Sequence, residues 1–545
     1  MRPNFTFSFS MPDRPSLLER TRLWIACLLA AGSIPGLLSA QQGAARIKVE
    51  ADRTTRPDEV HQVIAMIRGD ATSIVGLRVP VEARVLGGVP QKGMDWSLVT
   101  WDREKMERSK QLLPKMIYGI GPVCVETIFK FQGKCYLLGS KVLPDQMMAQ
   151  LIVQEFDPHS LVTKGGRELV QVPLERFGGA TRPMPGAAIG FNATLSADSS
   201  QLCLSTDPEN TSRPGATYVS LVFHKDLQLH WSNVLAFDQE PAGAELLQDL
   251  FDSEAVHWFL FRTMATKNPK DTGSPAIGIK LVRMDSSGQK MKDVELPGSA
   301  YVQDARMVLR PDGKLLFGGV WAERKMRNDR SKGMFVSSMN TGDLEWGAMK
   351  MVEFEKKVIE GHEELQRDMV VEDLLVMADG GLALLTDEHK LRTTQSSNFA
   401  NKMVTRESYI SGDLHILRTN RSGDKTWYTV IPRGLSLDSP HAGEPFALAF
   451  GDQLFVMMND AAGNEELRKH KEPIPVIEKG GEAMVFDFKE DGSGRGKVAL
   501  DERGQGYFLP GDRWILGPGE IGLLGSRDLG GKETFPVRVF IESGR

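Results

Sequence analysis

The chain has 545 residues, of which 41% are hydrophobic and 25% charged, and its formal net charge is −5. This is the balance of a globular protein with ample length for a large core, so a disordered chain is excluded. The slight acidic excess also excludes a general nucleic-acid binder.

The first forty residues have the order of a secretion signal. Basic residues between positions 14 and 22 precede an apolar stretch over 23–38, and the small residues Ser39 and Ala40 follow it. Signal peptidase substrates show this order, and the apolar stretch is shorter than the roughly 20 residues of a membrane-spanning helix. We expect a signal peptide over 1–40, cleaved after Ala40, and a secreted or periplasmic protein. An uncleaved N-terminal anchor is the alternative.

The mature chain, 41–545, has no apolar run long enough to span a membrane, and we expect it to form a single domain. It keeps three cysteines, Cys124, Cys135 and Cys203. An odd number gives no disulfide framework, so we expect buried, inert thiols.

A hairpin pattern recurs along the whole mature chain. In residues 305–321 an apolar strand runs into Pro311-Asp312-Gly313 and a second apolar strand leaves it. This order of strand, turn residues and strand predicts a β-hairpin. Equivalent turns fall near residues 70, 133, 200, 254, 313, 380, 452 and 519. The copy near 254 has no glycine at its turn, and the first copy is the weakest.

Most of these hairpins are followed by a second one. The clearest second hairpins lie at 218–235, 277–296, 333–351 and 413–431. Two hairpins per repeat make a four-stranded antiparallel sheet, and a tandem array of such sheets is typical of a β-propeller. The prediction is an all-β propeller of eight blades by hairpin count, or seven if the weak first copy is false.

The two ends of the chain complete the same blade in this scheme. The last repeat has one hairpin and one further strand, 535–542, so it lacks an outer strand. The strand-like segment 45–52 could supply it, which would close the ring and remove an open sheet edge. A two-domain β-sandwich array, or a smaller propeller with an unrelated N-terminal segment, are the alternatives.

The long connections all fall between the second and third strands of the blades. They are the segments 207–215, 263–275, 322–333, 387–406 and 461–481. Such connections emerge on one side of an up-and-down ring, and binding residues favour long loops on a rigid scaffold. We therefore expect the ligand on this face.

Two neighbouring loops carry an excess of basic residues on a chain that is acidic overall, which would attract an anionic ligand. The candidate binding residues are Arg324, Lys325, Arg327 and Arg330 in one loop, and Arg392 and Lys402 in the other. Asp438 and His441 join them because they lie in a strand connection on the same face.

No catalytic or metal-binding motif survives inspection. The segment 491–497 resembles a phosphate loop but has wrong spacing and Val498 in place of a hydroxyl residue, so we expect a hairpin turn. Asp438, Ser439 and His441 are close in sequence, but this is not triad geometry. The pairs His230-Trp231 and His257-Trp258 lie in predicted strands, where packing is the expected role. We expect no metal and no cofactor.

Two of the second hairpins, 339–346 and 419–427, resemble the turn-and-tryptophan signature of bacterial quinoprotein-type (PQQ-like) propeller repeats. Trp231 ends a partial copy. The resemblance implies that Trp346 and Trp427 dock blade against blade and are largely buried. The quinone enzymes of that family usually have an adjacent pair of cysteines, which this chain lacks, and relatives without enzymatic activity include a scaffold of outer-membrane assembly.

The function expected from the sequence is that of an exported, non-enzymatic binding or scaffold propeller. Its loop-rich face would bind a protein or glycan partner. The alternative is a secreted hydrolase that acts on a glycan or ester at the ring centre, which would need carboxylates converging there. A quinone-dependent or electron-transfer enzyme is a third hypothesis.

Overall fold

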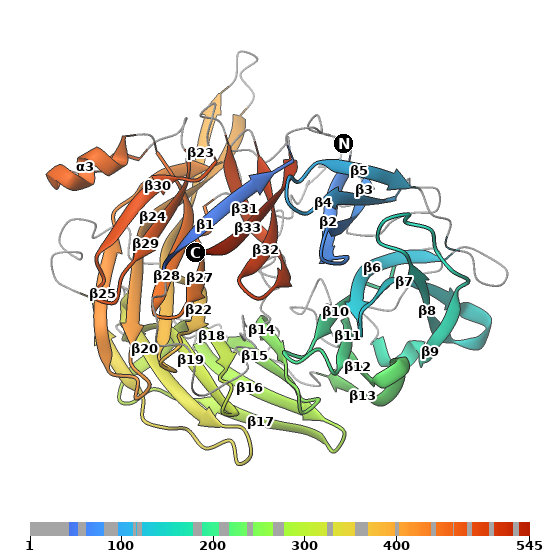
Figure 1. The fold of residues 1–545 in the computed structure, drawn as a ribbon. Coiled ribbons are helices and arrows are strands. Elements are labelled where there is room, and N and C mark those ends of the chain that lie inside the picture. The colour runs from blue at the N-terminus through green and yellow to red at the C-terminus, as the bar shows by residue number, and fades with distance from the viewer. Residues whose placement is uncertain are drawn as a thin grey trace, which may run out of the picture.

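The computed structural model describes residues 43–52, 61–80, 96–112, 116, 123–177, 188–206, 217–236, 244–264, 277–323, 331–354, 369–397, 403–437, 443–461, 463–472, 474–476, 482–500, 506–526 and 534–544. The chain folds into eight antiparallel sheets arranged in a ring (Figure 1). It is a β-propeller of eight blades, and the first, weakest hairpin copy is a true blade.

Each blade from the first to the seventh uses four strands in chain order. The first blade contains β2 (His61–Arg68), β3 (Ser73–Pro80), β4 (Ser97–Asp102) and β5 (Arg108–Leu112). The second contains β6 (Cys124–Phe131), β7 (Lys134–Leu143), β8 (Met148–Phe156) and β9 (Arg167–Pro173). The third contains β10 (Phe191–Leu195), β11 (Leu202–Thr206), β12 (Thr217–His224) and β13 (Gln228–Ala236). The fourth contains β14 (Ala244–Phe251), β15 (His257–Met264), β16 (Ile277–Asp285) and β17 (Gly288–Val294).

The later blades follow the same plan. The fifth contains β18 (Ala300–Leu309), β19 (Lys314–Glu323), β20 (Ser331–Asn340) and β21 (Lys350–Glu353). The sixth contains β22 (Met369–Val376), β23 (Leu382–Ser397), β24 (Met403–Thr419) and β25 (Lys425–Ile431), with β26 (Leu435–Leu437) added beside β24. The seventh contains β27 (Phe446–Phe450), β28 (Gln453–Asp460), β29 (Glu482–Phe488) and β30 (Gly494–Val498). Short helical segments are η2 (Pro144–Gln146), η3 (Leu174–Phe177), η4 (Lys225–Leu227) and α3 (Asn464–His470).

The eighth blade joins the two ends of the chain. Its strands lie in the order β31 (Tyr507–Gly517), β32 (Glu520–Ser526), β33 (Thr534–Gly544) and β1 (Gly43–Ala51). β1 pairs antiparallel with β33, with Arg46 opposite Glu542 and Ala51 opposite Val537. The predicted closure is therefore confirmed. In Figure 1 the blue β1 lies beside the red strands of this blade.

The core is divided between the blade interfaces. Eight buried apolar clusters occur among the described residues, and seven of them each join two neighbouring blades. The remaining cluster joins the first and eighth blades and also takes in Leu435 and Leu437 of β26. Trp101 and Leu524, for example, belong to the cluster between the first and eighth blades. A single four-stranded sheet cannot bury both of its faces, so every blade depends on both of its neighbours.

The tryptophans of the repeat signature dock neighbouring blades as predicted, and Trp346 and Trp427 pack against the core clusters without being fully buried. Trp346 is half-buried and donates from its indole nitrogen to the carbonyl of Asp293 in the fourth blade, 3.3 Å away. Trp427 is also half-buried and stacks on Phe488 of the seventh blade. Both lie near the outer rim, where the wedge between blades is open to solvent. Trp231, in the partial copy, is buried and donates to Ala255 of the next blade.

Two segments predicted as loops contain regular structure. Most of 387–406 is strand, because β23 and β24 continue far past the other strands of their blade. The segment 461–481 contains α3, which Arg468 ties to Pro432 of the sixth blade. The segment 491–497 falls in the hairpin between β29 and β30, as predicted. Among the described residues, no helix has the length and apolar character needed to cross a membrane.

Candidate functional site: a polar joint beneath a projecting arm

Buried polar side chains tie the inner strands of neighbouring blades together. In the fourth, fifth and sixth blades a β-bulge interrupts the inner strand, and the next residue is Gln248, Asp304 or Asp373. Each of these three accepts a hydrogen bond from a backbone N–H of the following blade, at 2.7 to 2.9 Å. The bulge turns this side chain out of its own sheet and towards the next one.

The carboxylates in this set are paired as well as buried. Asp304 accepts from Arg262 at 3.1 Å, and Asp373 accepts from Arg513 at 3.3 Å. Burial raises the pKa of Asp373 to about 6, although Arg513 and two backbone N–H groups favour its charged form. In the second blade, the buried Glu126 accepts from three successive backbone N–H groups at 189–191. These acids hold the ring together.

The interface between the third and fourth blades contains a chain that resembles a catalytic triad. His257 contacts Ser220 at 2.9 Å through Nδ1 and Asp249 at 3.0 Å through Nε2. Ser220 and His257 are both 0% exposed, so no substrate can reach the hydroxyl. Cys203 lies 3.6 Å from the same imidazole and is also buried, with a pKa raised well above that of a free thiol by burial. The predicted packing role of His257 is confirmed, and its group locks the interface.

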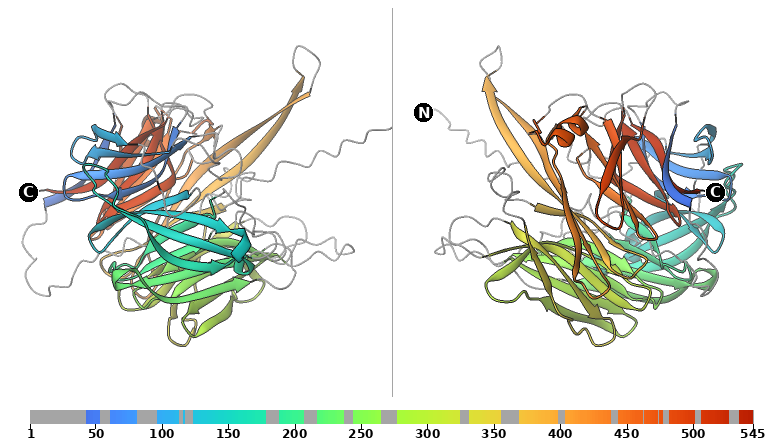
Figure 2. Two further views of the ribbon diagram at one scale, coloured as in Figure 1. Left: turned by 90° about the vertical axis from the view of Figure 1, so that its right-hand side faces the viewer. Right: turned by 60° about the vertical axis from the view of Figure 1, so that its left-hand side comes forward.

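The sixth blade carries a two-stranded arm that has no counterpart in the other described blades. β22 pairs with β23 only as far as Glu388, whereas β23 and β24 continue to pair from His389 opposite Ser411 to Ser397 opposite Met403. At about 3.4 Å per residue, this extension is roughly 27 Å long. Figure 2 shows it standing out from the ring as a narrow ribbon.

The arm begins at a second β-bulge. The pairing of β23 with β24 shifts between Asp387, opposite Leu414, and His389, opposite Ser411, so Gly412 and Asp413 of β24 together face the single residue Glu388. A Cβ at Gly412 on the facing strand would lie 2.9 Å from the carboxylate of Glu388, so any other residue at this position would require the Glu388 side chain to shift. On the outer side, β26 pairs with β24 at Tyr409–Ser411 and braces the base of the arm.

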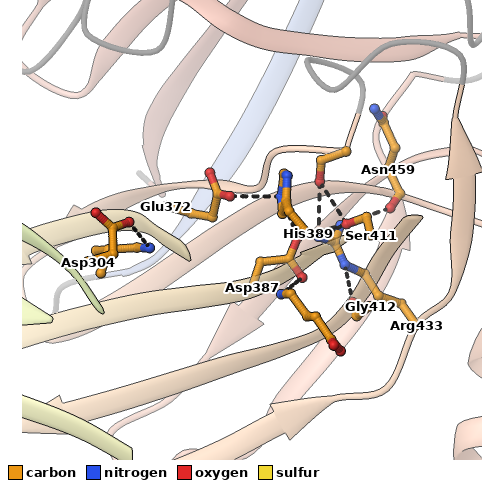
Figure 3. A network of polar contacts seen from close by, with 11 residues as sticks. Asp304, Glu372, Asp387, His389, Ser411, Gly412, Arg433 and Asn459 are labelled. Atoms are coloured by element: carbon orange, nitrogen blue, oxygen red, sulfur yellow. Dashed lines mark hydrogen bonds and ion pairs between the residues drawn. The ribbon is translucent and has the colours of Figure 1, made fainter. Parts of the chain in front are cut away.

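Arg433 binds the base of the arm to the ring (Figure 3). Its guanidinium, fully buried, pairs with Asp387 and donates to Ser411 at 2.6 Å and to the Gly412 carbonyl at 3.0 Å. It also donates to the carbonyl of Gly443, at 2.9 Å. A buried guanidinium is tolerated only when its donors are satisfied, and these partners come from the sixth blade, the arm and the connection to the seventh blade.

His389 lies on the inner side of the same joint, between two carboxylates. Its Nε2 is 2.9 Å from Glu372 and 3.1 Å from Asp387. Burial disfavours the charged imidazole, but the charges of Glu372 and Asp387 raise its pKa to about 9. His389 is therefore an imidazolium at neutral pH, and with Arg433 it balances the two carboxylates.

Glu372, Asp387 and His389 also form the one group among the described residues that could hold a metal ion. Their ligand atoms lie within 4.8 Å of one another. A histidine with two carboxylates suits a divalent cation. However, the oxygen of Asp387 that faces His389 already accepts from Ser411 and pairs with Arg433. A cation would have to displace this buried arginine, so the group fits an ion-paired joint better than a metal centre.

The structure describes only the backbone of one of the eight sequence-predicted site residues, so their role in binding stays a prediction. Arg324, Lys325, Arg327, Arg330, Lys402, Asp438 and His441 lie outside the described residues. Arg392 lies in the arm portion of β23, where the backbone is described. The joint was missed because its residues are scattered over four segments of the chain and match no motif. The sequence held one indication of the joint, a run of three ionisable residues at 387–389 (DEH) directly after an apolar strand.

No protein-family model matches the chain, and no curated protein matches its sequence. Solved structures match at low identity. Polysaccharide lyase Uly1 is 10% identical over 78% of this chain and 92% of its own, with a TM-score of 0.38. The propeller domain of the Trilobed protease from Pyrococcus furiosus is 8% identical over 82% and 98%, with a TM-score of 0.32.

A quinohemoprotein alcohol dehydrogenase from Pseudomonas putida HK5 is 9% identical over 91% of this chain and 78% of its own, with a TM-score of 0.39. The predicted resemblance to quinoprotein-type propellers is therefore confirmed at the level of the fold. At these identities and scores, the matches say nothing about activity.

Proposed function

We propose that the protein is a non-enzymatic binding propeller and that the arm formed by β23 and β24 is its main contact element. The observation that carries this proposal is the length of the arm beyond its blade, nine residue pairs from His389 to Ser397. An isolated two-stranded ribbon is marginally stable in water. A partner that covers the ribbon gives a reason for the chain to maintain it on a dedicated buried joint.

The arrangement of the described acidic groups supports a binding role over hydrolysis. A glycoside hydrolase needs two carboxylates on either side of an accessible bond. Glu372 and Asp387 are close together, but His389 lies between them and both are at least nine-tenths buried. Glu126, Asp304 and Asp373 are likewise occupied in holding the blades together.

Export is part of the same proposal. The basic, apolar and small residues before Gln41 support a secreted or periplasmic protein, whose partner would be an envelope or extracellular protein or glycan. Protein isolated from its native host should begin near Gln41 when its N-terminus is sequenced. Recovery of intact residues 1–40 in a cytoplasmic fraction would contradict export.

A variant with a shortened arm tests the binding role. Leu391 lies opposite Tyr409, so residues 392–408 can be replaced by Asn-Gly, a favoured two-residue hairpin turn. This change keeps His389, Ser411 and the brace from β26. We expect an unchanged melting temperature of the ring and loss of the partner that co-purifies with the intact protein from host envelope extracts. Equal recovery of that partner by the shortened protein would contradict the proposal.

A further inference from the structure

The two faces of the arm differ in the charge that the sequence gives them. In a β-ribbon alternate residues share a face, and so do residues directly opposite each other. The register therefore places His389, Leu391, Tyr409 and Ser411 on one face, and positions 390, 392, 406 and 408 on the other. Three of the last four are basic, Lys390, Arg392 and Arg406.

At the base of the arm, the first face is turned towards the ring. Tyr409 packs against the apolar cluster that includes Leu435 and Leu437, and Ser411 donates to Asp387. The positions of Lys390, Arg392 and Arg406 therefore lie on the opposite face of the ribbon from Tyr409 and Ser411. The other paired positions on that face are Thr394, Ser396, Val404, Ser408 and Ile410, so the part of the face that the structure describes has no acidic residue.

The basic positions follow one another along the ribbon at a regular interval. Lys390 and Arg392 are two residues apart on β23, and Arg406 lies opposite Thr394, two residues further. Each step corresponds to about 7 Å along the strand direction. The result is a line of three positive charges with hydroxyl-bearing residues beside it, on a chain whose net charge is −5. Such a line is complementary to an extended polymer with repeating negative charges.

We infer that this face of the arm binds a linear anionic polysaccharide, and this inference rests on the proposed binding function. The composition of the face distinguishes a polysaccharide from an acidic protein. The centres of protein interfaces are enriched in aromatic residues and arginine and depleted in lysine, serine and threonine. This face has no aromatic residue, and its polar positions are lysine, arginine, serine and threonine. Uronate or sulfate groups would pair with the basic side chains, while the hydroxyl groups would bond the sugar ring.

The test uses the full mature protein and polygalacturonate as the probe, with binding measured by isothermal titration calorimetry at low and physiological salt. The test variant is Lys390→Gln, Arg392→Gln, Arg406→Gln. A matched control, Lys290→Gln, Lys292→Gln, Lys425→Gln, removes the same charge from exposed positions on β17 and β25. We expect the test variant to bind at least about ten-fold more weakly at low salt, and the control to bind as the unmodified protein does. The affinity of the unmodified protein should fall about twenty-fold or more from 50 to 200 mM salt, as expected when about three ion contacts form.

Several results would overturn the inference. They are an absence of binding by the unmodified protein, equal losses in the test and control variants, or binding of poly-glutamate at least as tight as that of polygalacturonate. Neutral dextran should not bind, and binding of dextran would also contradict it. If the shortened arm loses the native partner while the test variant keeps it, the polysaccharide inference fails and the binding function stands.

Discussion

Single buried acids carry much of the contact between neighbouring blades. Asp304 is 1% exposed, and it joins three blades by accepting from Val371 and from Arg262. Removing its carboxylate leaves the buried N–H of Val371 without its acceptor and takes a charged partner from the largely buried guanidinium of Arg262. Both effects are costly because water cannot fully replace the lost partner.

We therefore expect Asp304→Ala to lower the free energy of unfolding by about 3 kcal/mol. Asp304→Asn, which keeps an acceptor for Val371, should lose less. Asp293→Ala is the control, because its carboxylate is exposed beside Lys280 and its loss should change stability by no more than about 0.5 kcal/mol. Urea unfolding of the three variants measures this, and a similar small loss in all of them would show that the tie contributes nothing.

His389 should make stability depend on pH in the alkaline range. Its pKa is about 9 in the folded protein and 6.5 for a free imidazole, so the folded state binds the proton more tightly. The resulting stabilisation is fully present below pH 6.5 and is lost as the pH rises through 9. The largest contribution is about 3 kcal/mol.

The test is the unfolding free energy of the unmodified protein and of His389→Gln at intervals from about pH 6 to about pH 10. The variant should be less stable at the acidic end, and the two curves should converge towards the alkaline end. Parallel curves would mean that His389 does not hold its proton between Glu372 and Asp387. Because the joint is ion-paired, neither Zn²⁺ nor Mn²⁺ should raise the melting temperature of the unmodified protein.

The tryptophans that join neighbouring blades differ in how deeply they are buried. Trp231 is 6% exposed with its indole N–H bonded to Ala255, whereas Trp346 is half-buried at the rim. We expect Trp231→Ala to cost about 3–5 kcal/mol and Trp346→Ala about half as much. Denaturant unfolding compares the two, and an equal or larger loss at Trp346 would contradict the packing described here.

The arm is the element that sequence patterning did not reveal. A strand buried on one face alternates apolar and polar residues, whereas a strand buried on both faces, such as β19, is almost continuously apolar. The arm borders no core along most of its length, so 390–397 contains only one aliphatic residue, Leu391, and reads as a polar loop. Its pairing is set by backbone hydrogen bonds and by the joint at its base, neither of which leaves a periodic signal.

The ring as a whole was predictable because its strands, unlike those of the arm, border a core. Each blade buries both faces of its sheet, so the hairpins repeat as apolar runs around turn residues such as Pro311-Asp312-Gly313. Closure followed from counting strands, because the last repeat lacked one and 45–52 had no other partner. The joint could not be predicted, since Glu372, Asp387 and Arg433 become neighbours only when three separate segments fold together.

Closure by β1 should matter to the whole molecule. Deleting residues 41–52 exposes the edge of β33 and removes Asp52, which accepts from the indole of Trp101 in the first blade at 2.9 Å. We expect a lower melting temperature for the entire ring, because each blade needs both neighbours. In the intact protein, amides of 46–51 should exchange within about 1 kcal/mol of the inner strands. Fast exchange there, with an unchanged melting temperature after deletion, would contradict closure.

The binding role is tested most directly by photo-crosslinking in the native host. One variant carries a photoreactive residue in the arm in place of Gln395, and another carries it in place of Thr341, in a short turn of the fifth blade. Adducts with a specific envelope or extracellular partner should form from the arm position and not from the turn. Adducts from position 341 alone, with none from position 395, would show that the arm is not the contact element.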